Sequence, residues 1–273
     1  MMPFRTVPAV PTSTFGAALS AQLRSDAARP LVTFYDDATG ERVELSVTTY
    51  ANWVAKTAGL VQDELDGERG QLALVDLPTH WLGAVWLGAA WTVGMRVSDD
   101  PAWAEQADLV VCGPEGTERY AGLAGRVPVV AISLRPLGAP FAGPLPPGVV
   151  DYGAVVLGQP DTFIAQDPPD AQDPAWAGSG AELTQADLLG LAEDPPWDAG
   201  ARLVTDVSPT TRRGLVTLLG PLLAGGGTVW VRHPEERGWE RRYDAERATS
   251  TLRDQPGPDQ PGDPGQPGQP ARS

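Results

Sequence analysis

The chain is poor in the residues from which most metal, redox and disulfide sites are built. Its 273 residues include one cysteine, Cys112, and two histidines, His80 and His233. A disulfide within the chain is therefore excluded, and the cysteine and histidine spacing of a zinc site is absent. Cys112 ends an apolar run that begins at Leu109, so we expect a buried thiol without a catalytic role.

The two histidines are interpreted as structural residues. His80 stands between a predicted strand and a predicted helix, a position typical of a capping or packing residue. His233 directly follows Val229-Trp230-Val231 and is predicted to lie at the surface. The sequence therefore gives no catalytic residue and no metal site.

Long apolar runs and positive charge are also scarce. No stretch of about 18 apolar residues is present, so no membrane-spanning helix is expected. Residues 1–9 lack the apolar core of a secretion signal, which predicts a cytoplasmic protein. The formal net charge is -15, and Lys56 is the only lysine. Such an acidic chain is not expected to bind nucleic acid or an anionic membrane surface.

Apolar segments of strand and helix length alternate along most of the chain. This alternation predicts an α/β fold with mostly parallel sheets flanked by helices. The expected helices are 14–29, 46–67, 81–91, 101 onward for a short turn, 184–193, 214–224 and 240–252. The expected strands are 31–35, 43–45, 71–76, 93–97, 109–112, 127–133, 202–206 and 228–232, of which the first two form a hairpin.

Composition divides the chain into three parts. Residues 1–13 are an N-terminal arm, and 14–252 are predicted to form the α/β domain. Within it, 135–173 is rich in proline and glycine, and forms either an irregular crossing or the start of a second subdomain. Residues 253–273 consist mainly of proline, glycine, glutamine and aspartate, a composition that predicts a disordered tail.

Four local features are considered as candidates for a function. Asp36, Asp37 and Glu41 could form an acid cluster, but their place on a hairpin turn favours a solvated tip. The tryptophans at 81, 86 and 91 are spread around one helix, which predicts a helix packed on both sides. Gly178-Ser179-Gly180 precedes a helix, where backbone amides can hold an anion. Gly225-Gly226-Gly227 is interpreted as the turn that closes a helix.

The order of the elements resembles the N-terminal domain of the adenylate-forming superfamily, which includes acyl-CoA synthetases. Three stretches carry this resemblance: residues 30–46 with the following helix to Leu65, residues 72–94 with Asp100-Pro101 beyond them, and residues 204–209 with 214–230. The resemblance implies a domain like the N-terminal subdomains of acyl-CoA synthetases. Short actinobacterial proteins that look like truncated members of this superfamily fit best.

The departures from the superfamily bear on activity. Its phosphate loop is a Ser/Thr/Gly run that ends in Pro-Lys-Gly. Here Gly178-Ser179-Gly180 is similar to its start and Leu183-Thr184 to its helix entry, while the middle and the lysine are missing. Glu182 adds a negative charge that disfavours a triphosphate.

Other superfamily segments are also missing. Thr210-Thr211 replaces the usual aromatic residue or histidine after Pro209. In the superfamily, later segments hold the adenine, magnesium and ribose sites and the lid lysine. The sequence ends before the positions that correspond to them. The resemblance therefore implies a domain without its catalytic parts.

Three hypotheses remain open at this stage. The first is a non-catalytic AMP-binding-like domain that binds a ligand or a protein partner. The second is one half of a split acyl-adenylating enzyme, and the third is an unrelated small-molecule-binding α/β protein. If ATP or AMP binds, the backbone amides of Gly178, Ser179 and Gly180 are the expected contacts, with the hydroxyl of Thr184. We also expect a homodimer or a protein partner, because a shortened domain would expose apolar surface, including some tryptophans.

Overall fold

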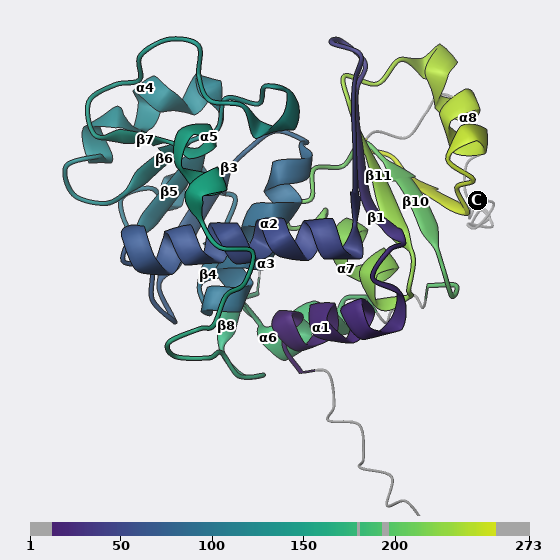
Figure 1. The fold of residues 1–273 in the computed structure, drawn as a ribbon, viewed down its shortest axis with the longest axis horizontal. Helices are drawn as coiled ribbons and strands as arrows, with labels where there is room; N and C mark the ends of the chain where they lie inside the picture. Colours follow the sequence, from purple (N-terminus) through teal and green to yellow (C-terminus); the bar gives the residue numbers. More distant parts are fainter. Residues whose placement is uncertain (1–12, 179–180, 193–196, 255–273) are drawn as a thin grey trace, which may run out of the picture.

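Two β-sheets organise the chain. The computed structural model describes residues 13–178, 181–192 and 197–254, and all structural statements concern these residues. One sheet has five strands in the order β12-β10-β11-β1-β2, and the other has seven in the order β7-β6-β5-β3-β4-β8-β9. Figure 1 shows the two sheets side by side with helices packed between them.

The N-terminal region forms the predicted helix, hairpin and second helix. The elements are α1 (Phe15–Asp26), β1 (Pro30–Asp36), β2 (Glu41–Ser46) and α2 (Val47–Gly59), which continues as a wider turn over Leu60–Glu64. Thr14 and Ser46 cap the two helices, because their hydroxyls accept from backbone amides of the first turn. Strands β1 and β2 are antiparallel, as the turn residues between them predict.

The middle of the chain builds the seven-stranded sheet. Its strands are β3 (Leu72–Asp76), β4 (Arg96–Ser98), β5 (Leu109–Cys112), β6 (Val129–Ala131), β7 (Val149–Asp151), β8 (Pro174–Trp176) and β9 (Leu183–Thr184). The helices between them are α3 (Trp81–Val93), α4 (Thr117–Tyr120) and α5 (Tyr152–Val155), and α6 (Gln185–Gly190) follows β9. All neighbouring strands run parallel except β8 and β9.

The C-terminal region completes the five-stranded sheet. It contributes β10 (Arg202–Thr205), α7 (Leu215–Leu223), β11 (Gly227–Arg232), α8 (Glu236–Ala245) and β12 (Ser250–Leu252). Strand β1 lies parallel to β11, so the first and last parts of the chain share this sheet. Only β2 runs antiparallel to its neighbour in it.

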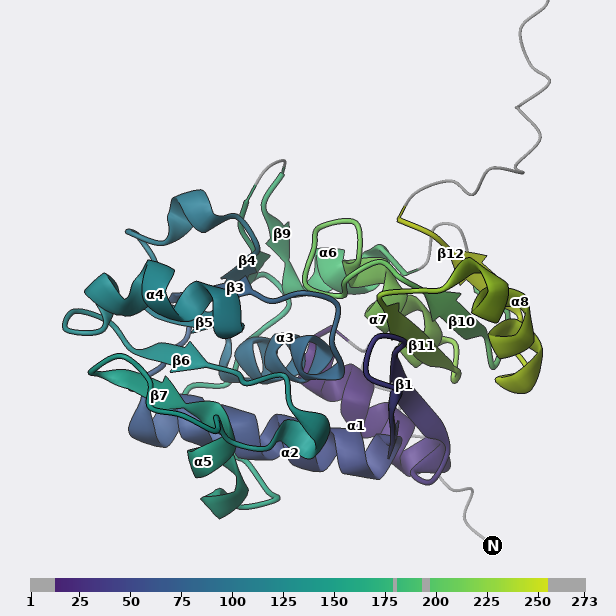
Figure 2. The same cartoon turned by 90° about the horizontal axis from the view of Figure 1, so that it is seen from above.

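The layers follow from alternating burial along the strands. Val229 and Val231 of β11 pack with Trp239 of α8, while Trp230 between them points into the main core. In the same way β3 turns Ala73 and Val75 to the main core and its other residues to the far face, beneath α4. Helices α1, α2, α3 and α7 therefore fill the space between the sheets, as Figure 2 shows from above.

Helix α3 is the centre of this inner layer. Each of its residues except Thr92 is buried, including Trp81, Trp86 and Trp91. The predicted packing of this helix on both sides is confirmed. In contrast, the expectation of exposed tryptophans is wrong, because none of the nine is classed as exposed. The large apolar side chains that are exposed are Leu137, Leu157 and Ile164.

Several predicted boundaries differ from the structure. The segment predicted as a helix over 240–252 is α8 followed by strand β12, which pairs with β10. Val93 belongs to α3, and the strand predicted over 93–97 begins at Arg96. Within the region 135–173, strand β7 pairs with β6 and so belongs to the seven-stranded sheet. Residues 1–12 of the predicted arm and 255–273 of the predicted tail lie outside the described residues.

Candidate functional site

The predicted remnant of a phosphate loop lies in the hairpin between β8 and β9. Trp176 pairs with Leu183 at the closed end of this hairpin. Gly178 has a φ of +154°, which favours glycine. A Cβ atom on Gly178 would lie 3.4 Å from Ser98 Oγ, so the residue sits directly against the end of β4. Ser179 and Gly180, the other two predicted contacts, lie outside the described residues.

The hydroxyl of Thr184 forms hydrogen bonds within the chain. Its Oγ1 accepts from the amide of Asp187 at 3.2 Å and donates to Asp187 Oδ2 at 2.8 Å. The same carboxylate accepts from the Thr184 amide at 2.9 Å, which completes a capping box at the start of α6. The expected nucleotide contact is therefore committed to helix capping.

The charges beside this hairpin are mainly negative. Glu182 forms an exposed ion pair with Arg96, with 3.3 Å between Oε1 and Nη1. Asp99 Oδ1 would lie 3.8 Å from a Cβ on Gly178, and burial raises the pKa of this carboxyl. Lys56 lies on α2 and pairs with Asp161 at 2.9 Å. The hairpin is thus flanked by carboxylates, which repel a triphosphate.

A larger concave site lies between the two sheets. This inter-sheet cleft has a volume of about 530 Å³. Its walls include Asp36 and Arg232 at the ends of β1 and β11, Asp76 at the end of β3, and Leu134 after β6. All four strands run parallel to a neighbour, so the cleft collects their carboxyl ends. Open α/β sheets bind ligands at this edge, and the volume is typical of small-molecule pockets.

Opposite charges meet on both walls of the cleft. On one wall, Asp36 Oδ1 lies 2.8 Å from His233 Nδ1, and Asp36 Oδ2 lies 4.0 Å from Arg232 Nη1. On the other wall, Asp76 Oδ2 accepts from Arg119 at 2.9 Å and from the Tyr120 hydroxyl at 2.7 Å. The cleft can therefore offer both hydrogen-bond donors and acceptors to a polar ligand.

Two wall residues have a strained backbone. Leu134 has a φ of 55° and His233 a φ of 49°. A residue other than glycine in this region costs about 1–3 kcal/mol, and such residues are concentrated at functional sites. His233 is classed as exposed, as predicted. The strain at two cleft positions supports the cleft as a functional site.

His80 caps helix α3, as the sequence predicts. Its Nδ1 accepts from the amide of Leu82 at 3.2 Å, and the ring packs edge-on against Phe34. Burial, with a smaller contribution from Arg232, lowers the pKa of His80 to about 3. The ring is therefore neutral near pH 7, and its role is structural. Cys112 is buried as predicted, and burial raises the pKa of its thiol to about 12.

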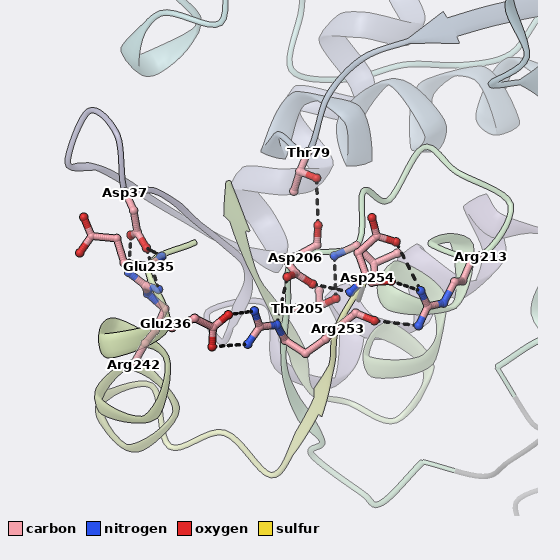
Figure 3. Close-up of polar contacts among 11 residues, drawn as sticks. Asp37, Thr79, Thr205, Asp206, Arg213, Glu235, Glu236, Arg242, Arg253 and Asp254 are labelled. Atoms are coloured by element: carbon pink, nitrogen blue, oxygen red, sulfur yellow. Dashed lines mark hydrogen bonds and ion pairs between the residues drawn. The ribbon is translucent and has the colours of Figure 1, made fainter. Parts of the chain in front are cut away.

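The predicted solvated tip of the first hairpin is wrong. The side chains of Asp36 and Asp37 are only 7% and 11% exposed. Asp37 Oδ1 lies 2.5 Å from Arg242 Nη2 on α8, as Figure 3 shows. The cationic partners are Arg232 of β11 and Arg242 of α8, about 200 residues later in the chain. A turn pattern contains no signal for such distant partners.

Sequence reasoning also missed the cleft. Asp76, Arg119 and Arg232 come from three separated elements, and none belongs to a motif. The available signal was position, because Asp76 and Arg232 each end a predicted strand. Among the described residues, no cluster of three or more potential metal ligands occurs and no helix is long and apolar enough to cross a membrane.

This sheet order and layering define an acyl-CoA synthetase-like α/β fold. An acyl-CoA synthetase from Brucella canis superposes with a TM-score of 0.70 and 17% identity, covering 86% of this chain and 47% of that chain. The chain thus spans about half the length of that synthetase. The fold predicted from the sequence is confirmed.

The family follows from a closer relative. A TIGR03089 family protein of Mycobacterium tuberculosis (strain ATCC 25618 / H37Rv) is 36% identical over 251 residues, which cover 89% of this chain and 99% of the relative. The chain belongs to the TIGR03089 family. No family model matches it.

Proposed function

We propose that this chain is a non-catalytic AMP-binding-like domain, which binds a ligand or a partner without adenylating a carboxylate. The observation that carries the proposal is the hairpin between β8 and β9. The hydroxyl of Thr184 is held by Asp187, and Glu182 and Asp99 place carboxylates beside the hairpin. A triphosphate would meet repulsion here instead of stabilisation.

The chemistry of adenylation supports the proposal. Negative charge grows around the α-phosphate as the carboxylate attacks, and cationic groups must stabilise it. Arg96, at the start of β4, is paired with Glu182, and Lys56 is paired with Asp161 on a different element. The positive charge of each is thus already offset by a carboxylate. We infer that the domain uses the inter-sheet cleft for binding instead.

The proposal is tested by ATP–pyrophosphate exchange. The purified chain is incubated with Mg·ATP, labelled pyrophosphate and a panel of short, medium and aromatic carboxylates, with an active acyl-CoA synthetase as the positive control. We expect no exchange above the value without carboxylate. Carboxylate-dependent exchange by the purified chain would contradict the proposal.

Exchange that arises only after co-expression with a second polypeptide would instead support the split-enzyme hypothesis.

A homodimer or protein partner also remains a prediction. It was expected from exposed apolar surface; among the described residues this surface does not include tryptophans but does include Leu137, Leu157 and Ile164. Light scattering at increasing protein concentration tests it, and a constant monomer mass would contradict self-association.

A further inference from the structure

Arg232 differs from the other well-buried arginines in the described chain. Its side chain is 23% exposed and lines the inter-sheet cleft, yet its guanidinium donates no hydrogen bond to any described residue. Three arginines of similar burial each donate to a carboxylate: Arg202 to Glu246, Arg242 to Asp37 and Arg253 to Asp206. Because Arg232 is partly exposed to the cleft, its N–H groups are accessible there and can donate to a ligand.

The neighbouring carboxylates do not satisfy Arg232. Asp36 Oδ1 accepts from the Ala38 amide at 3.0 Å and faces His233, while Oδ2 remains 4.0 Å from Arg232, beyond hydrogen-bond distance. Glu41 is also close enough to interact electrostatically, but its Oε1 is buried without a partner. These carboxylates offset part of the positive charge and leave the N–H donors of Arg232 unused.

The walls around Arg232 suit a small, partly apolar molecule. Leu77, Pro78 and Leu134 line the cleft. Its charged lining residues are the arginines Arg119 and Arg232 and the carboxylates of Asp36, Asp76 and Glu115. Arg119 on the opposite wall is held by Asp76 and is more exposed, at 55%. The planar guanidinium of Arg232 matches the geometry of a carboxylate or a phosphate, to which it can donate two parallel hydrogen bonds.

We propose that the inter-sheet cleft binds a small organic oxyanion, a carboxylate or a phosphate monoester, and that Arg232 is its anion-binding residue. The apolar part of the ligand lies against Leu77, Pro78 and Leu134. This inference deepens the proposed function, because it names the ligand class of a domain that binds without adenylating. It depends on the cleft alone and not on the hairpin between β8 and β9.

Calorimetric titration with phenyl phosphate and with benzoate tests the inference. The probes share an apolar ring and differ in the oxyanion, so they distinguish a phosphate ester from a carboxylate. We expect saturable binding of at least one probe. Arg232→Gln should weaken it about tenfold or more, because charge-assisted hydrogen bonds are lost. Arg126→Gln is the control, since Arg126 pairs with Glu105 at the surface, away from the cleft.

Two outcomes would overturn the inference: no binding of either probe at tens of millimolar, or equal binding by wild type and Arg232→Gln. If Arg232→Gln does not fold, Arg232→Lys keeps the charge but loses the paired hydrogen bonds, and it should also weaken binding. Unchanged binding by Arg232→Lys would then count against it. Pyrophosphate exchange is measured on the same samples, so a failure of the proposed function is seen separately from a failure of anion binding.

Discussion

Arg253 Nε lies 3.0 Å from Asp206 Oδ2 at the carboxyl end of β10. The other oxygen of this carboxylate accepts from the Asp254 amide at 2.7 Å, and the backbone carbonyl of Asp206 accepts from the Thr79 hydroxyl at 3.1 Å. Figure 3 shows these contacts converging on Asp206. Thr79 follows β3 of the other sheet, so Asp206 connects both sheets and the segment after β12.

Replacing Asp206 with alanine should destabilise the fold. The change removes the acceptor of Arg253 Nε and of the Asp254 amide, and the side chains of Asp206 and Arg253 are largely buried. We expect a loss of about 1–3 kcal/mol in the free energy of unfolding, measured by urea titration. Glu105→Ala, which breaks an exposed pair with Arg126, should change it by no more than about 0.5 kcal/mol. Equal effects of the two variants would contradict this assignment.

His80 should make the fold sensitive to acid. Its pKa is about 3 in the folded state and about 6.5 in the unfolded chain. Between these values only the unfolded chain binds the proton, so stability falls as the pH falls from 6.5 towards 3.

His80→Asn tests this effect, because asparagine can still cap α3 without titrating. Relative to this variant, the wild type should lose about 2 kcal/mol between pH 7 and pH 5. Urea titrations of both proteins across this range measure the difference in their free energies of unfolding. The carboxylates are the same in both proteins, so their contributions cancel in this difference. Parallel pH profiles for the two proteins would show that His80 is not the cause.

Gly226 should tolerate no side chain. A Cβ atom there would lie 1.8 Å from the carbonyl oxygen of Ala201. The three nearest atoms all belong to the backbone of Ala201, which cannot move aside as a flexible side chain could. Gly226→Ala should therefore destabilise the fold by about 3 kcal/mol or more. Gly16→Ala is the matched control, because a Cβ on the helical Gly16 would have no atom within 4 Å. This substitution should raise the free energy of unfolding by about 0.5 kcal/mol. Thermal melting compares the two, and a mild effect at Gly226 would contradict the close contact.

Local patterns predicted the elements well where a residue acts on its own neighbours. His80 caps α3 as predicted, and Thr14 and Ser46 cap helices at the residues where the predicted helices begin. Capping can be predicted because it depends on amides two or three residues away. The alternation of strands and helices along the chain also predicted mostly parallel sheets. The strand β12 was predicted as helix, since its pairing with β10 is formed by residues about 47 positions apart.

The site was harder to predict, because its residues meet only through topology. Asp36 was interpreted as a solvated turn residue, yet β11 places Arg232 and His233 beside it. The resemblance to the superfamily drew attention to Gly178 and Thr184, where the structure places a tight hairpin and a capping box. The cleft at the carboxyl ends of the strands could have been anticipated only after the parallel strand order was known.

The most direct test of the central claim is a titration with Mg·ATP followed by tryptophan fluorescence. Trp176 Nε1 would lie 3.6 Å from a Cβ on Gly178, so a phosphate in the hairpin would change the environment of this indole. The titration is made on the wild type, Gly178→Asp and Arg232→Gln. We expect no saturable signal that depends on Gly178 at millimolar ATP. A saturable signal that persists in Arg232→Gln and disappears in Gly178→Asp would contradict the account, because the hairpin would then hold a phosphate.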